Sequence, residues 1–389
     1  MSMRILLLTD GISPYVIGGM QKHSRLLAEY LARSGNQVTI YHCVDANMSI
    51  RDEDVRNSFS SAASKNITVR TFFYEDKGKL PGHYLRAQKI LSKEYFNVMQ
   101  KEVIIPDFVY TKGFVGHELL NKRIELPYAC KVGVKFHGMN MFQKQANFRG
   151  ELQKHLLRSP VKAIMQKSDV VFSYGGKITD IIEQTGISRK KILEIPAGIE
   201  ADWIHSEITA KEDVRPMRFL FVGRYDRVKG LPELYKAIQD SQFQNYSWEF
   251  HFVGAIPIDK QLLGTRYVYH GAISNQNTLK EIYDASDILV NVSFSEGMPN
   301  VILEGMARGL VILATDVGAT ALLLDQNGIL IENNDQAKIL EALLRLMHLK
   351  NQELNQMKIH SLKKLEEFKW ERIVVAHESQ ITKVLKESI

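Results

Sequence analysis

The sequence has 389 residues, which is longer than a single ordinary domain and predicts two domains. Its composition, 45% hydrophobic and 24% charged residues, is typical of a folded globular protein. Its two cysteines, Cys43 and Cys130, exclude a disulfide framework and a clustered thiolate metal site, and they favour a cytoplasmic protein. The formal net charge of +6 is divided unevenly, with +10 in residues 1–200 and −4 in the rest, which favours a polyanionic partner for the first half.

Short apolar runs alternate with amphipathic stretches of helical length along the whole chain. This pattern is typical of βαβ units, so we expect an α/β protein whose domains are doubly wound and Rossmann-like. The opening run MSMRILLLTDG is too short for a signal sequence and predicts a first buried strand, and no run approaches a membrane span. The predicted strands are residues 4–8, 37–42, 68–73, 108–111, 132–136, 170–174, 192–196, 218–223, 249–254, 268–271, 288–292, 311–315 and 328–331.

A charged segment with one proline and little apolar periodicity, residues 198–217, predicts the linker between the domains. We therefore expect a first domain over residues 1–200 and a second over residues 201–369. The last helix, about residues 370–389, is expected to pack back on the first domain.

The first predicted strand runs into a loop whose glycines, Gly18 and Gly19, directly precede an amphipathic helix. Glycine lets the backbone approach an anion closely, and a helix N-terminus presents free N–H groups to it. A glycine pair before a helix is equally typical of a plain turn. The dinucleotide pattern GxGxxG is absent, which argues against NAD.

An acidic string, Asp52 to Asp54, has the DxD form that a different transferase fold uses to hold a divalent cation. It lies in a charged stretch without a strand, where acidic runs are usually solvated. The histidines show neither HxxxH nor HExxH spacing. We therefore expect no metal site and no cofactor.

The basic excess of the first half is concentrated between residues 135 and 167. A basic amphipathic surface is typical of contact with anionic lipid, and an ordinary helix with a solvated back is the alternative. The stretch has no nucleic-acid reading motif, so no nucleic acid partner is expected. Its members are Lys135, Lys144, Arg149, Lys154, Arg158, Lys162 and Lys167, interleaved with Phe142, Phe148, Leu152, Leu156, Leu157 and Ile164.

In the second half, the strand ending at Gly223 is followed by Arg224 and Lys229. Ligands of doubly wound sheets bind at the carboxyl ends of the strands, and two cations there suit a diphosphate. Solvated loop residues would give the same pattern.

The segment VNVSFSEGMPNVILEGMARG is more specific. A buried strand ends, a polar turn with Glu296 follows, Pro299 fits the first helical position, and Glu304 lies two helical turns further on. The carboxylates can accept hydrogen bonds from sugar and ribose hydroxyls, while the first N–H groups of the helix, at Asn300 and Val301, stay free for phosphate oxygens.

Together these segments resemble the retaining glycosyltransferases of group 1, also called family 4, which have the GT-B architecture of two Rossmann-like domains facing across a cleft. The resemblance spans nearly the whole chain. Its motifs are the pair Gly18 and Gly19, KFHGMN around His137, IPAGIE before the linker, GRYDRVKG, and the glutamates Glu296 and Glu304 separated by seven residues.

The resemblance implies a hexosyltransferase of the EC 2.4 class that uses a nucleotide-diphosphate sugar, UDP rather than GDP, bound mainly by the second domain. Arg224 and Lys229 would bind the diphosphate, Glu304 the ribose and Glu296 the transferred sugar, with His137 beside the sugar. The expected catalytic residues are His137, Arg224, Lys229 and Glu296. The expected donor-binding residues are Gly18, Gly19, Gly223, Arg224, Lys229, Glu296, Gly297, Met298, Pro299, Asn300, Val301 and Glu304.

Two segments depart from the family pattern. Ala197 and Gly198 stand where an Asn-Gly pair is usual, and VGATALL replaces a loop that usually carries a glutamate. The donor pocket is therefore expected to differ at these points.

The expected function is transfer of a sugar to a glycan or lipid-linked acceptor in surface polysaccharide or glycolipid synthesis, in the cytoplasm or peripherally on the inner face of the membrane. No first-domain carboxylate stands out as a nucleophile, so the leaving phosphate is expected to act as the base, with charge stabilisation by the cations. A nonhydrolysing sugar-nucleotide epimerase and a non-catalytic sugar-nucleotide-binding protein are the alternatives.

Overall fold

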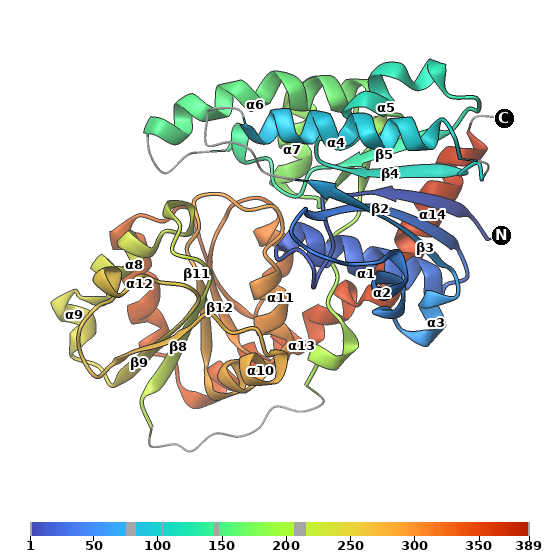
Figure 1. The fold of residues 1–389 in the computed structure, drawn as a ribbon. Helices are drawn as coiled ribbons and strands as arrows, with labels where there is room; N and C mark the ends of the chain where they lie inside the picture. Colours follow the sequence, from blue (N-terminus) through green and yellow to red (C-terminus); the bar gives the residue numbers. More distant parts are fainter. Residues whose placement is uncertain (1, 75–82, 103, 144–147, 206–214, 388–389) are drawn as a thin grey trace.

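The computed structural model describes residues 2–74, 83–102, 104–143, 148–205 and 215–387, with the side chains of residues 148–153 excepted. It has two parallel β-sheets, each covered by helices on both faces (Figure 1). This arrangement confirms the predicted α/β class with two Rossmann-like units. All thirteen predicted strands are present, with ends within a few residues of those expected.

The first sheet has seven strands in the order β3-β2-β1-β4-β5-β6-β7. Because side chains alternate along a strand, Leu6 and Leu8 of β1 pack toward helix α4, while Ile5 and Leu7 pack toward α1 and α14. In chain order the strands are β1 (Arg4–Leu8), β2 (Gln37–Asp45), β3 (Ile67–Tyr74), β4 (Phe108–Lys112), β5 (Lys131–Lys135), β6 (Val170–Ser173) and β7 (Ile192–Glu194). The helices are α1 (Gly19–Arg33), α2 (Asp52–Asn57), α3 (Ser61–Ser64), α4 (His83–Met99), α5 (His117–Lys122), α6 (Phe148–Lys167) and α7 (Lys177–Gln184).

The second sheet has six strands in the order β10-β9-β8-β11-β12-β13. Both sheets reverse their winding at a central pair, β1 beside β4 and β8 beside β11, where loops diverge and leave room for a ligand. The strands are β8 (Met217–Val222), β9 (Trp248–Val253), β10 (Tyr267–Gly271), β11 (Ile288–Asn291), β12 (Val311–Thr315) and β13 (Gly328–Ile331). The helices are α8 (Leu231–Ile238), α9 (Ser241–Gln244), α10 (Gln276–Ala285), α11 (Asn300–Ala307), α12 (Gln336–Met347), α13 (Asn351–Leu365) and α14 (Trp370–Lys386).

The chain crosses between the two sheets twice, and the two crossings are bonded to each other. Ile199 forms a bridge with Lys369, with its N–H donated to Phe368 and its carbonyl accepting from Trp370. Beyond this bridge, α14 lies against α1 and the first sheet, and the ring of Trp370 stacks on Tyr30. Residues 206–214 of the predicted linker lie outside the described residues.

One apolar core runs from the first sheet into the second, joining side chains such as Tyr174 and Ala197 to Met298 and Ile302. The loops of the two halves are also bonded directly, because Gln143 Nε2 donates to the carbonyl of Glu296 at 2.8 Å. The two halves therefore meet at the carboxyl ends of their strands. Among the described residues no helix is both long and apolar enough to cross a membrane.

The acidic string lies outside the strands, as the sequence predicted: Asp52 to Asp54 begin the short helix α2, with Asp54 paired to Arg51. One detail differs from the sequence interpretation. Lys135 does not belong to a basic surface, because it lies in β5 with no exposed area. Lys144 lies outside the described residues, as do the side chains of Phe148, Arg149 and Leu152.

Candidate active site

The strand end of β8 and the turn after it form one wall of the site. Arg224 is exposed, and Lys229 lies in the short turn that Asp226 caps by accepting the N–H of Val228 at 3.1 Å. Gly230 follows with φ of 71°, and a Cβ there would collide with the carbonyl oxygen of Val292. The turn is therefore held tightly against the loop after β11.

That contact brings Lys229 and Glu296 together. Lys229 Nζ lies 2.6 Å from Glu296 Oε1, and Ser293 Oγ donates to the same oxygen at 2.7 Å. The ammonium has three N–H donors, so two remain for a ligand. The sequence interpretation had assigned these residues separate roles, whereas the structure makes them neighbours.

The loop from Glu296 leads into α11, whose N-terminus faces the first half of the chain. Pro299 is the N-cap, with ψ of 114°, rather than the first helical residue as the sequence suggested. Asn300 and Val301 thus lie in the first turn, where N–H groups have no acceptor within the helix. The sulfur of Met298 likewise meets the first half, since it accepts the N–H of Ala197 at 3.0 Å.

At Gly297 the backbones of the two halves approach each other closely. A Cβ at this position would collide with the carbonyl oxygen of His137, and the ring of Tyr174 would be 3.3 Å away. On the other side Ala319 donates its N–H to the carbonyl of Gly297 at 2.8 Å, and Gly318 has a φ of 59° that fits it against the same backbone. The VGATALL segment thus supports the loop through its backbone, without the glutamate that is usual there.

His137 lies in a buried polar cluster of the first half. Its Nδ1 is 2.6 Å from the Tyr174 hydroxyl, and its Nε2 is 3.2 Å from Lys112 Nζ, which also lies 2.7 Å from His23 Nδ1. Burial, followed by the nearby Lys112 and Lys135, holds the pKa of His137 well below its ordinary value. Both ring nitrogens are engaged, so this histidine suits hydrogen bonding better than proton transfer.

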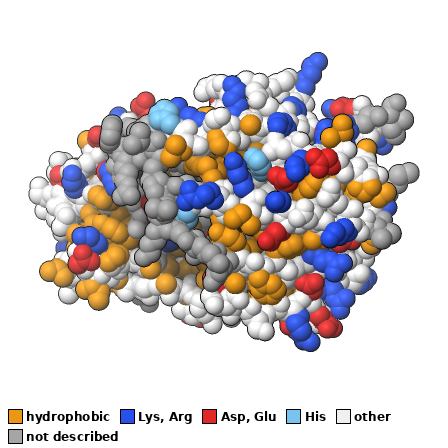
Figure 2. All heavy atoms as spheres, turned by 45° about the horizontal axis from the view of Figure 1, so that its top comes forward, with side chains coloured by type: hydrophobic (Ala, Val, Ile, Leu, Met, Phe, Trp, Pro, Cys, Tyr) orange, Lys and Arg blue, Asp and Glu red, His pale blue; other side chains and the backbone are white. Residues whose placement is uncertain are grey.

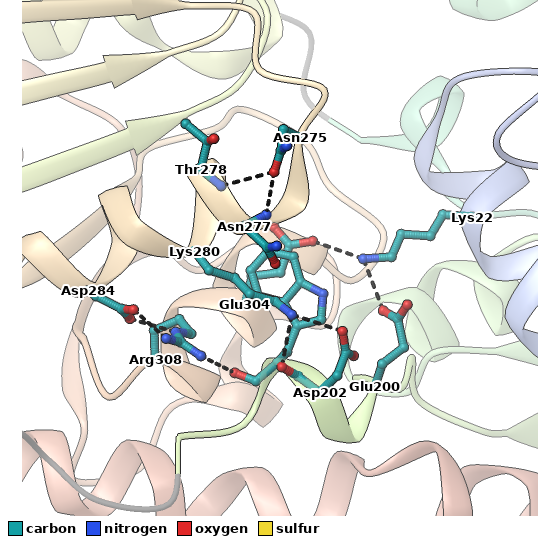
Figure 3. A network of polar contacts seen from close by, with 11 residues as sticks. Lys22, Glu200, Asp202, Asn275, Asn277, Thr278, Lys280, Asp284, Glu304 and Arg308 are labelled. Carbon is teal, nitrogen blue, oxygen red and sulfur yellow. Dashed lines mark hydrogen bonds and ion pairs between the residues drawn. The ribbon is translucent and has the colours of Figure 1, made fainter.

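Glu304 is buried and bonded from both sides. Tyr283 Oη donates to Oε2 at 3.1 Å. Lys22 Nζ lies 3.3 Å from Oε1 and 3.1 Å from Glu200 Oε2 (Figure 3). Gly18 is the N-cap and Gly19 the first residue of α1, and a Cβ at Gly19 would lie 3.7 Å from the amide of Asn300. The N-termini of α1 and α11 therefore lie close to each other.

Several residues of this site were missed from the sequence. Lys112, Tyr174 and Asp10 each lie at or just beyond the carboxyl end of a strand of the first sheet. Because ligands of doubly wound sheets bind at these strand ends, polar residues there could have been recognised as candidates for the site. Lys22 could have been noticed because it lies one helical turn after the glycine pair. Tyr283 gave no signal, because an aromatic residue at its position is typical of the apolar core.

Asp10 adds a titrating group at the end of β1. Burial raises the pKa of Asp10 to about 6, against the hydrogen bond that Gln21 Nε2 donates to it at 3.0 Å and the charge of Lys112. A carboxyl whose folded pKa exceeds its unfolded pKa binds more protons when folded, so it costs stability as the pH rises through about 4 to 6.

We therefore expect Asp10→Asn to raise the free energy of unfolding at pH 7.5 by about 1 to 3 kcal/mol. The gain should shrink to about 0.5 kcal/mol near pH 4, where the wild-type carboxyl is protonated in the folded state and about half protonated in the unfolded state. Urea denaturation of both proteins at pH 4, 5, 6 and 7.5 measures this difference in the free energy of unfolding. A difference that does not change with pH would contradict the raised pKa.

Among the described residues, no group of three or more histidine, cysteine, aspartate or glutamate side chains is placed to hold a metal ion. The charged groups of the site are instead paired: Lys229 with Glu296 and Lys22 with Glu304, while Arg224 follows the end of β8.

Comparison with known proteins places this arrangement in a family. Residues 17–203 match the model described as Glycosyltransferase Family 4, and residues 216–348 match the model described as Glycosyl transferases group 1. A protein named as a teichuronic acid biosynthesis glycosyltransferase, TuaC of Bacillus subtilis, is 24% identical over 369 residues, covering 89% of this chain and 90% of its own.

Solved structures share the fold over the whole chain. Sucrose-phosphate synthase from Thermosynechococcus elongatus has a TM-score of 0.72 at 19% identity, covering 99% of each chain. HepE from Anabaena, solved with UDP and glucose, has a TM-score of 0.68 at 13% identity, covering 99% of this chain and 100% of its own.

Proposed function

Because the chain belongs to the glycosyltransferases of group 1 and family 4, we propose that it transfers a hexose from a UDP-sugar to a glycan or lipid-linked acceptor, with retention of anomeric configuration. The observation that supports this most is the Lys229 and Glu296 pair at the carboxyl edge of the second sheet, beside the N-terminus of α11. A cation, a carboxylate and free helix N–H groups are the complement of a sugar diphosphate.

The proposed reaction breaks the bond between the sugar C1 and the β-phosphate oxygen, and the electron pair stays on that oxygen. Arg224, Lys229 and the first N–H groups of α11 stabilise the charge that develops there. The acceptor hydroxyl oxygen bonds to C1 on the same face, and its proton passes to the leaving phosphate. Glu296 holds the transferred sugar, and Glu304 holds the ribose.

His137 contributes position rather than proton transfer in this proposal. Its carbonyl lies against Gly297, at the junction where the sugar and acceptor would meet, and its ring is fixed by Tyr174 and Lys112. An epimerase would need free acid and base groups in the first half, and the engaged ring of His137 does not favour that alternative.

The choice of UDP is supported by the UDP complex of the HepE structure. A surface polysaccharide acceptor is supported by the name of the Bacillus subtilis relative. To test the function, the protein is incubated with UDP-, GDP- and ADP-sugars in excess chelator, with and without lipid-phosphate acceptors, while nucleoside diphosphate release is measured. Acceptor-dependent release from a UDP-sugar is expected. Tight binding without release would indicate a sugar-nucleotide-binding protein, and a requirement for added Mg²⁺ or Mn²⁺ would contradict the metal-free mechanism.

We further propose that the acceptor is met at an anionic membrane surface. Helices α4 and α6 expose the apolar side chains Tyr84, Ile90 and Leu156, with exposed fractions of 42%, 53% and 60%. On the face turned forward in Figure 2, hydrophobic side chains lie beside lysine and arginine. The basic residues of the two helices include Arg86, Lys89, Lys93, Lys154, Arg158, Lys162 and Lys167.

Binding to vesicles that contain anionic lipid should therefore be strong at low salt and fall as salt screens the attraction. The triple variant Lys89→Glu, Lys93→Glu and Lys162→Glu should bind at least about tenfold more weakly, since each basic residue near the surface contributes about 1 kcal/mol. A charge-matched control reverses Lys236, Lys338 and Lys350, which are exposed on the second half. Equal binding of both triple variants in vesicle sedimentation would contradict this surface.

A further inference from the structure

Lys22 forms ion pairs that link three parts of the molecule. It comes from α1 of the first half, and its ammonium contacts Glu200 in the segment between the halves and Glu304 in α11 of the second half (Figure 3). Its Nζ also lies 5.1 Å from the centre of the Trp203 ring. No other residue of α1 forms an ion pair with the second half among the described residues.

The ammonium is held in its charged form by these partners. The side chain is 24% exposed, and although burial lowers the pKa of Lys22, Glu304 and Glu200 together raise it above the ordinary value. Without this cation, two carboxylates from different parts of the chain would face each other. The contact therefore favours the arrangement in which α1 and α11 lie together.

Glu304 can hold Lys22 and a ribose at once. A carboxylate has about four acceptor positions, and Lys22 and Tyr283 use one on each oxygen. A ribose diol bound to Glu304 would lie directly beside a cation supplied by the first half.

We propose that Lys22 is a positioning residue that couples donor binding in the second half to closure of the first half onto it. This inference rests on the proposed donor site. Glu304 binds the nucleotide, and Lys22 ties the occupied glutamate to α1, so that the acceptor half is held in place for transfer. Lys22 thus affects turnover through domain position rather than through donor affinity.

The test compares Lys22→Met with a matched control at Lys280, a second lysine near the Trp203 ring. Lys280 Nζ lies 5.3 Å from the Trp203 ring centre and pairs with Asp202 at 2.8 Å, but it has no contact with Glu304. Lys280→Met therefore removes a lysine charge and a ring contact from the same segment and keeps the link between α1 and α11. Lys22→Arg keeps the charge and should restore most of the coupling.

The measurements are UDP affinity by calorimetry, kcat and KM for the donor, and the radius of gyration with saturating UDP by small-angle scattering. For Lys22→Met we expect UDP affinity and KM within about threefold of wild type, kcat lower by at least about tenfold, and a larger radius of gyration. Lys280→Met and Lys22→Arg should match wild type within about threefold. Lys22→Gln, which keeps a hydrogen-bond donor without the charge, replaces Lys22→Met if melting shows that the latter is unfolded.

Two outcomes would overturn the coupling role. One is unchanged kcat and radius of gyration in Lys22→Met. The other is a loss of UDP affinity as large as that of Glu304→Ala, which would make Lys22 a direct ligand of the nucleotide. Normal UDP affinity of folded Glu304→Ala would instead overturn the proposed donor site, so the two failures are distinguishable.

Discussion

Replacing Lys229 with alanine should lower kcat between about tenfold and about a hundredfold, while UDP affinity falls less. The ammonium is 2.6 Å from Glu296 and has two further donors for the diphosphate, so it stabilises charge that grows as the bond to the leaving phosphate breaks. A charge-assisted hydrogen bond contributes about 1.5 to 3 kcal/mol, and one made mainly in the transition state affects turnover more than binding. Steady-state kinetics with the UDP-sugar and calorimetry with UDP measure the two effects.

The control for Lys229→Ala is Lys236→Ala, on α8 in the same half, where the side chain is exposed and no role in the site is proposed. It should leave kcat unchanged. Lys236→Ala should cost only about 0.5 kcal/mol of folding stability because its side chain is exposed, whereas Lys229→Ala should cost about 1 to 3 kcal/mol because it leaves Glu296 without its cation. A folded Lys229→Ala protein with wild-type kcat and wild-type UDP affinity would place the diphosphate elsewhere.

The sequence predicted the strands well because their signal is local. Runs such as residues 4–8 and 311–315 are apolar and bounded by turn residues, and the structure places them inside the two sheets. The start of the helix after Pro299 was predicted one residue too early, because proline fits the first helical position, whereas here it is the N-cap and the helix begins at Asn300. The two-sheet class followed from the alternation of these runs with helical stretches.

The contacts between distant segments could not be predicted in the same way. The pairing of Lys229 with Glu296 depends on the adjacency of β8 and β11, which a single sequence does not specify. Lys22 meets Glu304 across 282 positions of the chain, so its partner is set by how the two halves pack. Lys135 was wrongly assigned to a basic surface. In the structure it is buried and donates to the carbonyl of Ile195, and the sequence does not distinguish such a lysine from an exposed one.

Gly297 is the position at which a single methyl group should have the largest effect on turnover. Its backbone has an ordinary φ, so alanine fits the local conformation, yet its Cβ would collide with the carbonyl oxygen of His137 in the other half. A backbone oxygen cannot rotate away, so the two loops must move apart. Displacement of about 1 Å in an active site can cost about a hundredfold in rate, and we expect a loss of kcat of that size in Gly297→Ala.

Donor affinity should survive in Gly297→Ala, because Lys229, Glu296 and Glu304 all lie on the second half and keep their own contacts there. The control is Gly35→Ala, where φ is 91° and no atom lies within 4 Å of the added Cβ, so the substitution strains the backbone without a collision. Gly35→Ala should lose about 1 kcal/mol of stability and keep its activity, since left-handed backbone costs that much for an L-residue. Gly297→Ala should lose turnover as well as stability, because its collision is with a backbone atom of the other half. The contradicting result would be a kcat of Gly297→Ala within about threefold of wild type, measured with saturating donor. In that case the close approach of Gly297 to His137 is not needed for transfer, and the two halves must be held together by other contacts.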